Sequence, residues 1–142
     1  MAEIIRIEGA SADMLAQVNR LLRQLTEHAE NCTPELLETI VKSPAAELWV
    51  AKENSEIVGM ATLAMVLKPD GIFARIEDLV VGESQRGKGI GNLLMTQLIA
   101  RANFHHARHI ELTSNSRRVA ANKLYQKLGF TVRDTNVYRL RL

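Results

Sequence analysis

The feature of the sequence that most constrains the fold is an apolar stretch that runs into a glycine-rich turn and then into a helical pattern. The apolar residues end at Val81, and after a short polar stretch residues 86–91 read Arg-Gly-Lys-Gly-Ile-Gly. Apolar residues then recur at helical spacing, at Leu93, Leu94 and Leu98. The pattern predicts a strand, a turn and a helix, with glycines at the turn.

The composition of this turn favours the binding of an anion. Glycines at alternating positions, Gly87, Gly89 and Gly91, allow a positive φ and leave no side chain between a ligand and the backbone amides. The first amides of the helix that follows have no partner within the helix, and they lie at the positive end of its dipole. Arg86 and Lys88 add positive charge at the rim. We therefore expect a phosphate or a pyrophosphate to bind here, because a tight structural turn alone does not require three glycines and two cations.

Two nucleotide-binding motifs are excluded by their spacing. A Walker A loop ends in Gly-Lys-Ser or Gly-Lys-Thr, and the sequence contains neither ending. A dinucleotide-binding fingerprint reads Gly-x-Gly-x-x-Gly, whereas the glycines here are spaced Gly-x-Gly-x-Gly. The anion is therefore expected to belong to another kind of ligand.

Residues 86–91 resemble the central motif of the GNAT superfamily of acetyl-CoA-dependent N-acetyltransferases, Arg/Gln-x-x-Gly-x-Gly/Ala. A second stretch, residues 121–130, resembles another family motif, Ala-x-x-Leu/Phe-Tyr-x-x-x-Gly-Phe, at the spacing that the family uses. The resemblance extends over about residues 46–131. It implies an enzyme that transfers an acetyl group from acetyl-CoA to a primary amine. It assigns coenzyme binding to Arg86, Gly87, Lys88, Gly89, Ile90 and Gly91.

Hydrophobic periodicity predicts strands and helices within a single domain, residues 1–142. The expected strands are 3–8, 48–51, 57–67, 72–81 and 109–113; the expected helices follow Ser11, follow Thr33, and cover 89–103 and 117–128; a closing hairpin is expected from 130–133 and 136–141. The crossover from 72 to 113 requires its two strands to be parallel in one sheet. The resemblance implies the same α/β architecture, a mixed, mostly antiparallel sheet in which the fourth and fifth strands are parallel and splay apart, with helices on both faces.

Composition narrows the classes of partner. A net charge of +2 and an aromatic content of 4% give no basis for nucleic-acid binding, and no apolar run approaches the length of about 18 residues that a membrane span needs. The one cysteine, Cys32, has no partner for an internal disulfide, and the N-terminus lacks the pattern of a secretion signal, so a cytoplasmic protein is expected. His105, His106 and His109 lack the spacing of known metal sites, and no metal is expected.

The resemblance also implies which residues carry the chemistry. Backbone amides at a bulge just before the turn, at Leu79, Val80 and Val81, would face the pantetheine arm and the thioester carbonyl. Tyr125 matches the motif tyrosine whose hydroxyl protonates the departing thiolate. The alternative interpretation of residues 79–81 is an ordinary buried strand, and that of Tyr125 is a core tyrosine without a catalytic role. No side chain is arranged as a nucleophile, because Cys32 lies far from both motifs in the sequence, so direct attack in a ternary complex is expected.

The base that deprotonates the amine is expected on the strand before the turn. Strand alternation puts Glu77 on one face with Leu79 and Val81, where its carboxylate would remove the amine proton directly or through a water, or bind the ammonium form. The equally weighted alternative is that Glu77 is a solvated or ion-paired strand residue without a catalytic role. Many relatives carry Asn seven positions before the tyrosine, where this chain has Arg118. Asn122 is the candidate that replaces it in the contact to pantetheine.

The acceptor is expected to be a small primary amine such as an amino sugar, an amino acid or a polyamine. A protein N-terminal or lysine amine is the alternative within the same class, and a CoA-binding sensor without turnover is the alternative outside it. We expect the acceptor to be recognised by the turn 68–71 and the segment 27–33, although neither carries a recognisable specificity code. The strand expected over 136–141 would be able to pair with a second chain at a sheet edge and so form a homodimer.

Overall fold

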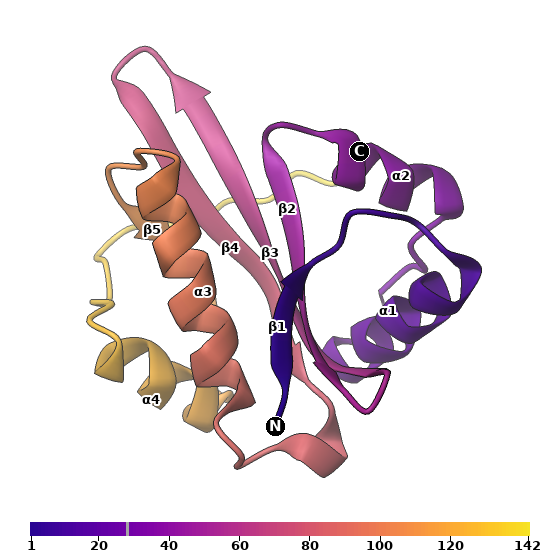
Figure 1. Ribbon diagram of the computed structural model, residues 1–142. Helices are drawn as coiled ribbons and strands as arrows, with labels where there is room; N and C mark the ends of the chain where they lie inside the picture. The colour runs from indigo at the N-terminus through magenta and orange to yellow at the C-terminus, as the bar shows by residue number, and fades with distance from the viewer. Residues whose placement is uncertain (28) are drawn as a thin grey trace.

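Figure 1 shows the computed structural model, which describes residues 1–27 and 29–142. Its strands are β1 (Glu3–Arg6), β2 (Ala46–Glu53), β3 (Glu56–Lys68), β4 (Gly71–Val81) and β5 (Ile110–Glu111). Its helices are α1 (Ala12–Leu25), α2 (Pro34–Lys42), α3 (Ile90–Phe104) and α4 (Val119–Lys127), and a short 3-10 turn, η1 (Glu83–Gln85), precedes α3. None of the helices in the described residues is long and apolar enough to cross a membrane.

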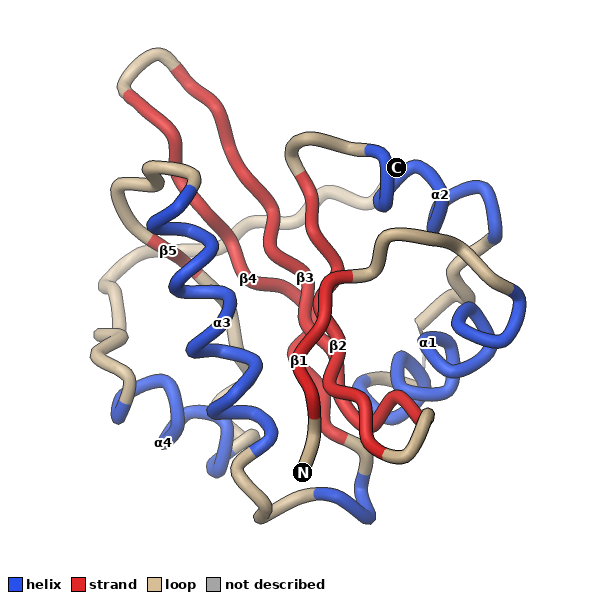
Figure 2. Tube along the Cα trace, in the orientation of Figure 1, coloured by secondary structure: helices blue, strands red, loops and turns tan. Residues whose placement is uncertain are grey.

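The strands of the described chain form one five-stranded sheet in the order β1-β2-β3-β4-β5 (Figure 2). Each neighbouring pair is antiparallel except β4 and β5, which run parallel. The parallel pair is short, because Ala74 pairs with Ile110 and Arg75 with Glu111, and beyond these pairs the two described strands are no longer joined. The mixed, mostly antiparallel sheet with a parallel fourth and fifth strand that splay apart is therefore confirmed.

Helices cover both faces of the sheet, with α1 and α2 on one side and α3 and α4 on the other (Figure 1). The core on the α1–α2 side includes Leu37 and Val80, and the core on the α3–α4 side includes Leu79 and Leu94. Leu79 and Val80 are neighbours in β4, so this strand contributes to both cores. Burial of apolar side chains on both faces fixes the position of β4 within the molecule.

The first two helices begin where their capping residues predict. The hydroxyl of Ser11 accepts a hydrogen bond from the amide of Met14 at the start of α1, and the hydroxyl of Thr33 accepts one from the amide of Leu36 at the start of α2. Pro34 follows Thr33 at the first helical position, where a missing N–H costs nothing. These local signals were therefore sufficient to place both helix starts.

Two expectations about the last third of the chain are wrong. The fifth strand comprises Ile110–Glu111 instead of 109–113, and residues 131–142 contain no strand, so the predicted closing hairpin is absent. The alternating apolar residues of that region are typical of a strand. A strand also needs a partner for its backbone hydrogen bonds, and the pattern of one segment does not identify that partner.

Candidate functional site

A groove of about 580 Å³ lies beside β4, beyond its last pair with β5. Its wall is formed by the ends of α1 and β4, the glycine-rich turn, and the starts of α3 and α4. The predicted coenzyme-binding residues in this wall are Leu79, Val80, Val81, Arg86, Gly87, Gly89, Ile90 and Gly91. Lys88 and Asn122 are not part of the wall. The fold thus brings the two sequence motifs together at one groove.

The glycine-rich turn has the predicted backbone conformation at two of its three glycines. Gly87 has a φ of 80° and Gly89 a φ of 81°. A Cβ at either position would meet no atom within 4 Å, so glycine is needed there for its conformation and not for space. Gly91 is different, because it lies inside α3 and a Cβ there would be 3.3 Å from Cδ2 of Leu124 in α4. The expectation of a positive φ is therefore wrong at Gly91, where close helix packing is the reason for glycine.

The start of α3 presents backbone donors toward the groove. Gly89 is the N-cap residue, and no side chain caps this helix. Ile90 and Gly91 form the beginning of the first turn, and both line the groove. Amides at this position have no partner within the helix and lie at the positive end of its dipole. The arrangement is suited to an anion such as a phosphate.

Two cations flank the turn, and each is bonded to a nearby residue. Nε of Arg86 donates to the backbone oxygen of Val81 at 3.2 Å, and Nζ of Lys88 donates to Oε1 of Gln85 at 3.1 Å. Both side chains are exposed. They therefore add a positive field at the rim, while the backbone amides supply the directed donors.

A β-bulge interrupts β4 just before the turn. Two residues of β4, Asp78 and Leu79, oppose a single residue of β3, and Asp78 has a φ of 54°, which few residues with a side chain adopt. Ile76 and Leu79 both lie in the α3–α4 core, so Glu77, the neighbour of Ile76, points to the opposite face. The prediction that Glu77 shares a face with Leu79 and Val81 is therefore wrong, because the bulge changes the alternation between them.

Backbone groups of β4 beyond the bulge point into the splay between β4 and β5. The carbonyl of Leu79 accepts from Nη2 of Arg118 at 3.1 Å, and the carbonyl of Val81 accepts from Arg86. Val81 pairs with Gly59 beyond the bulge, where the N–H and C=O of one residue point to the same edge of an antiparallel strand, so the Val81 amide faces the splay together with the carbonyls of Leu79 and Val81. Val80 lies between them, and its backbone is directed to its partner strand β3.

Tyr125 lies on α4 with its side chain in the α3–α4 core, where it is 6% exposed. Its ring packs edge-on against Phe130 at a centroid distance of 6.1 Å. Burial raises the pKa of the Tyr125 hydroxyl above its ordinary value, and a hydrogen bond and the charge of Arg118 offset part of that rise. The hydroxyl is therefore protonated at neutral pH, and Arg118 links it to the Leu79 carbonyl in the splay.

Glu77 and Asp78 place two carboxylates at the bulge. Glu77 is partly exposed and forms an ion pair with Arg75, whose Nε lies 2.9 Å from its Oε1. Burial, and then the charge of Glu77, raise the pKa of Asp78 above its ordinary value. Neither carboxylate belongs to the groove wall. Because Glu77 lies on the opposite face from Leu79 and is partly exposed, its carboxylate is accessible from the α1–α2 side of the sheet.

Asn122 is engaged with the turn that precedes α4. Its Nδ2 donates to the backbone oxygens of Asn115, at 3.0 Å, and Arg118, at 2.8 Å. These bonds hold the turn that carries Arg118. The structure therefore places Asn122 next to a groove residue but outside the groove.

Sequence reasoning missed several groove residues, most of which flank the two motifs, whereas two come from a distant segment of the chain. Gln24 and Leu25, at the end of α1, line the groove, and Oε1 of Gln24 accepts from the amide of Glu83 in η1 at 3.1 Å. They reach the site only through tertiary packing. No motif marks them, and the helical pattern of α1 gives no information about which end meets the turn.

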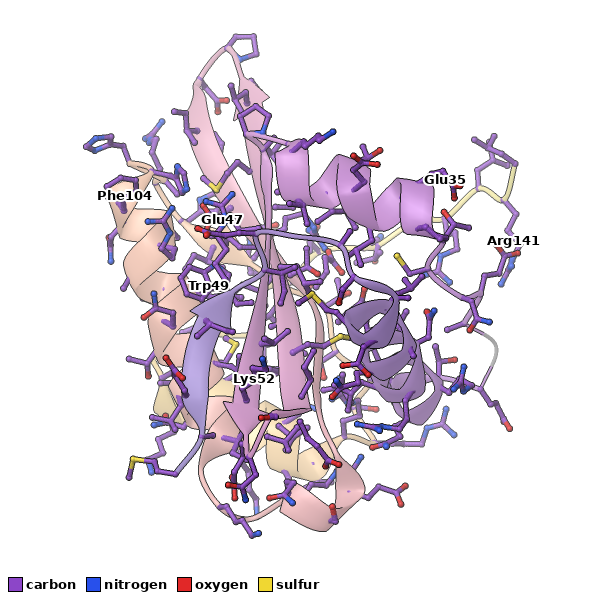
Figure 3. All side chains as sticks on the ribbon, turned by 45° about the vertical axis from the view of Figure 1, so that its right-hand side comes forward. Glu35, Glu47, Trp49, Lys52, Phe104 and Arg141 are labelled. Atoms are coloured by element: carbon purple, nitrogen blue, oxygen red, sulfur yellow. The ribbon has the colours of Figure 1, made fainter. Side chains whose placement is uncertain are left out.

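His105 lies in a polar cluster around the buried carboxylate of Glu47, which Figure 3 shows near Trp49. Glu47 is 3% exposed, and its Oε2 lies 2.6 Å from Nε2 of His105. Its carboxylate also accepts hydrogen bonds from Nε and Nη2 of Arg101, at 2.9 and 2.8 Å, and from Nε1 of Trp49, at 2.9 Å. Burial opposes the ionisation of Glu47, but these partners lower its pKa to about 2. Within residues 1–27 and 29–142, no group of three or more metal-ligating side chains occurs.

Several curated proteins are similar to this chain in sequence, and two of them illustrate the similarity. It is 36% identical over 81 residues to L-2,4-diaminobutyric acid acetyltransferase from Halalkalibacterium halodurans, over 56% of this chain and 42% of that protein. It is 31% identical over 90 residues to N-acetylaspartate synthetase from Xenopus tropicalis, over 63% of this chain and 32% of that protein. The aligned region thus spans less than half the length of either relative.

The fold and the sequence profile agree with this similarity. A solved structure described as a transcriptional regulator from Bacillus halodurans C-125 superimposes on the whole chain with a TM-score of 0.85, at 25% identity and 100% coverage of both chains. The profile of the Acetyltransferase (GNAT) family matches residues 15–130, from α1 to the end of the second motif. The chain therefore belongs to the acetyltransferase (GNAT) family.

Proposed function

We propose that this protein transfers an acetyl group from acetyl-CoA to the primary amine of a small molecule, by direct attack of the amine in a ternary complex. The observation that carries the proposal is the groove beside β4, where an uncapped helix start and the outward-facing backbone groups of Leu79 and Val81 converge. A diphosphate suits the helix start, because open amides there bind anions. An extended arm that contains amides suits the free edge of β4, which offers both donors and acceptors. Coenzyme A contains both groups.

Two parts of the coenzyme have candidate binding residues. The diphosphate would bind the amides of residues 87–91, with Arg86 and Lys88 balancing its charge. The pantetheine arm would lie along residues 79–81 of β4. Asn122 would join that contact only by giving up its two bonds to the turn before α4.

The chemistry requires removal of a proton from the amine and delivery of a proton to the thiolate. The amine nitrogen attacks the thioester carbonyl carbon, the carbon–sulfur bond breaks, and the thiolate leaves. Tyr125 would protonate the thiolate, because its burial keeps the hydroxyl protonated at neutral pH. Glu77, directly or through a water, would accept the proton from the amine. A backbone amide of β4 directed at the developing oxyanion would contribute about 3 kcal/mol to transition-state stabilisation.

The acceptor is proposed to be an amino acid or a similarly small amine. The names of the two relatives refer to diaminobutyric acid and to N-acetylaspartate, which supports a small acceptor. Glu77 points to the α1–α2 face, so the acceptor would approach from that side. The segment 27–33 between α1 and α2 is the better candidate for recognising it, although residue 28 lies outside the described residues. The turn 68–71 lies at the other end of β4 from the bulge.

The decisive experiment combines binding with turnover. Calorimetric titration with CoA tests the groove, and release of CoA thiol from acetyl-CoA is then measured with diaminobutyrate, aspartate, amino sugars, polyamines and a peptide with a free N-terminus. We expect CoA to bind and small amines to give the fastest thiol release. Faster release with the peptide would assign the protein to protein acetylation. Absence of CoA binding would contradict the proposal.

A second candidate function is a CoA-binding sensor without turnover. It is favoured by the description of the similar Bacillus halodurans structure as a transcriptional regulator. Tyr125 is not part of the groove wall, but its hydroxyl is protonated and interacts with the groove residue Arg118, which favours the enzyme because a sensor has no use for a proton donor there. The same experiment separates the two, since a sensor would bind CoA and release no thiol with any amine.

A further inference from the structure

One face of β4 carries two charged side chains, of which the proposed mechanism uses only one. Ala74 and Ile76 of this strand lie in the α3–α4 core, so Arg75 and Glu77 point to the opposite face. Both side chains are partly exposed, Arg75 at 36% and Glu77 at 42%. The pair is therefore open to a small molecule that approaches from the α1–α2 side of the sheet.

Arg75 uses only one of its donors within the described part of the chain. Its Nε donates to Oε1 of Glu77 at 2.9 Å, and its Nη1 and Nη2 have no partner among the described residues. The carboxylate opposite it in the register, that of Glu111 in β5, is paired with Arg133 at 3.1 Å and lies 3.5 Å from Nε2 of His109. The two terminal nitrogens of an arginine bind a carboxylate through two parallel hydrogen bonds. In Arg75 these nitrogens are therefore available to a ligand.

Glu77 lies near the end of the proposed coenzyme channel where the thioester belongs. The diphosphate is proposed at residues 87–91 and the pantetheine arm along residues 79–81, so the arm runs from the turn toward the bulge. Glu77 immediately precedes this bulge. An amine held by Glu77 therefore lies on the thioester side of the channel, and the guanidinium of Arg75 lies beside that amine.

We propose that Arg75 selects the acceptor by binding its carboxylate, so that the substrate is a free amino acid whose α-amine is acetylated. The inference rests on the proposed function, because the position of the coenzyme defines the acceptor site. Glu77 binds the amine, and Nη1 and Nη2 of Arg75 bind the carboxylate. The two side chains are in direct contact, so they match an ammonium and a carboxylate attached to one carbon atom.

The reaction at this site has one nucleophile and one leaving group. The α-nitrogen forms a bond to the acetyl carbon as the carbon–sulfur bond of the thioester breaks, which gives an N-acetylated amino acid and CoA. The amine proton passes to Glu77, directly or through a water, and Tyr125 supplies the proton of the thiol, as in the proposed function. Arg75 takes no part in these proton transfers and is a positioning residue for the acceptor.

The same pair of side chains disfavours the other classes of acceptor. A polyamine and an unmodified amino sugar have no anion for the guanidinium of Arg75. The N-terminal amine of a peptide is attached to a carbon whose carbonyl group is an uncharged amide. Each of these amines would leave the terminal nitrogens of Arg75 without an anionic partner. Charge complementarity thus favours an α-amino acid.

The test compares free amino acids with their α-carboxamides as acceptors. The carboxamide keeps the α-amine and the side chain and removes only the negative charge. Diaminobutyrate and aspartate, each paired with its α-carboxamide, are used, and kcat/KM is measured from thiol release. The variants are Arg75→Met, which removes the guanidinium, and Arg75→Lys, which keeps the charge without the fork. The matched control is Arg133→Met, because Arg133 is also paired with a glutamate whose side chain is 42% exposed.

The wild type and Arg133→Met should prefer an acid over its carboxamide by roughly ten- to a hundredfold, which is the range that hydrogen bonds to a charged group supply. Arg75→Met should lose this preference, and Arg75→Lys should keep part of it. All variants should keep the wild-type KM for acetyl-CoA. Loss of the contact between Arg75 and Glu77 affects acid and carboxamide alike, so the ratio of their kcat/KM values reports on the carboxylate alone.

Two results would overturn the inference and leave acetyl transfer intact: equal kcat/KM for acid and carboxamide in the wild type, or a preference that persists in Arg75→Met. Absence of thiol release with every amine would contradict the proposed function instead. Calorimetric titration with the amino acids in the presence of CoA then decides the inference by itself. Binding that Arg75→Met weakens at least roughly tenfold supports it, and equal or absent binding overturns it.

Discussion

Nη2 of Arg118 donates to the backbone oxygen of Leu79 at 3.1 Å, and this bond ties the start of α4 to the free edge of β4. The Leu79 carbonyl is also an acceptor that the proposed pantetheine arm would use, so Arg118 and the coenzyme compete for it. The same guanidinium interacts with the hydroxyl of Tyr125. Arg118 is therefore a positioning residue that connects the proposed coenzyme channel to the proposed acid.

Replacement Arg118→Met should separate coenzyme affinity from turnover. Methionine cannot donate a hydrogen bond, so the Leu79 oxygen loses the Arg118 donor in the free protein. In the complex with CoA the same oxygen would accept a hydrogen bond from the pantetheine arm. A hydrogen bond is worth about 1 kcal/mol net, so the dissociation constant for CoA should fall roughly fivefold. The kcat should fall as well, because the Tyr125 hydroxyl loses the cation that favours release of its proton.

Calorimetry with CoA and steady-state kinetics check the two effects of Arg118→Met separately. The control is Arg117→Met, because Arg117 lies outside the groove and its side chain bonds to Asn115 in the turn before α4. Arg117→Met should leave both quantities unchanged. Weaker CoA binding by Arg118→Met would show instead that Arg118 itself contacts the coenzyme.

Tyr125→Phe should lower kcat by about a hundredfold or more, with little change in the KM for acetyl-CoA. The substitution keeps the ring that packs against Phe130 and removes only the proton donor. Because burial raises the pKa of the Tyr125 hydroxyl, loss of wild-type activity through its deprotonation should occur only above about pH 10. The control is Tyr138→Phe, because Tyr138 is an exposed tyrosine in the segment that follows α4. A kcat equal to wild type in Tyr125→Phe would remove Tyr125 from the mechanism.

Glu77→Gln should lower kcat/KM by roughly ten- to a hundredfold in steady-state kinetics, because the amide cannot accept the proton of the amine. The matched control is Glu111→Gln. Like Glu77, Glu111 has a side chain that is 42% exposed, and it is paired with an arginine, Arg133. Glu111→Gln should keep the wild-type kcat/KM. If Glu77→Gln does the same, a water carries the proton without help from this carboxylate.

The parts of the site that depend on neighbouring residues in the sequence could be predicted, and the parts that depend on pairing could not. Positive φ at Gly87 and Gly89 follows from local composition, as do the caps of α1 and α2. The face of Glu77 depends on where β4 skips a residue against β3, which is a property of two strands. Gln24 reaches the groove only because α1 packs beside η1. The absence of a closing hairpin depends in the same way on a partner strand.

Gly89→Ala should cost about 1–2 kcal/mol of unfolding free energy and weaken CoA binding, because alanine disfavours the φ of 81° that opens the start of α3. The added methyl group would meet no atom within 4 Å, so the cost is conformational. The control is Gly9→Ala, where a methyl group also meets no atom and φ is not positive. Chemical denaturation and calorimetry with CoA give the two quantities. Stability and affinity equal to those of Gly9→Ala would show that the turn does not need this conformation.

Glu47 should make the stability of the protein depend on pH. Its pKa is about 2 in the folded protein against an ordinary value of 4.5, so its contribution is fully present above about pH 5 and is lost as the pH falls toward 2. The difference corresponds to on the order of 3 kcal/mol of unfolding free energy. Glu47→Gln should therefore be less stable at pH 7 and lose less stability on acidification, as measured by urea denaturation at a series of pH values. The control is Glu38→Gln, an exposed carboxylate on α2 whose pKa Lys42 also lowers; because solvent screens this exposed pair, Glu38→Gln should reduce the dependence only slightly. A Glu47→Gln curve parallel to that of the wild type would mean that other carboxylates carry the acid sensitivity.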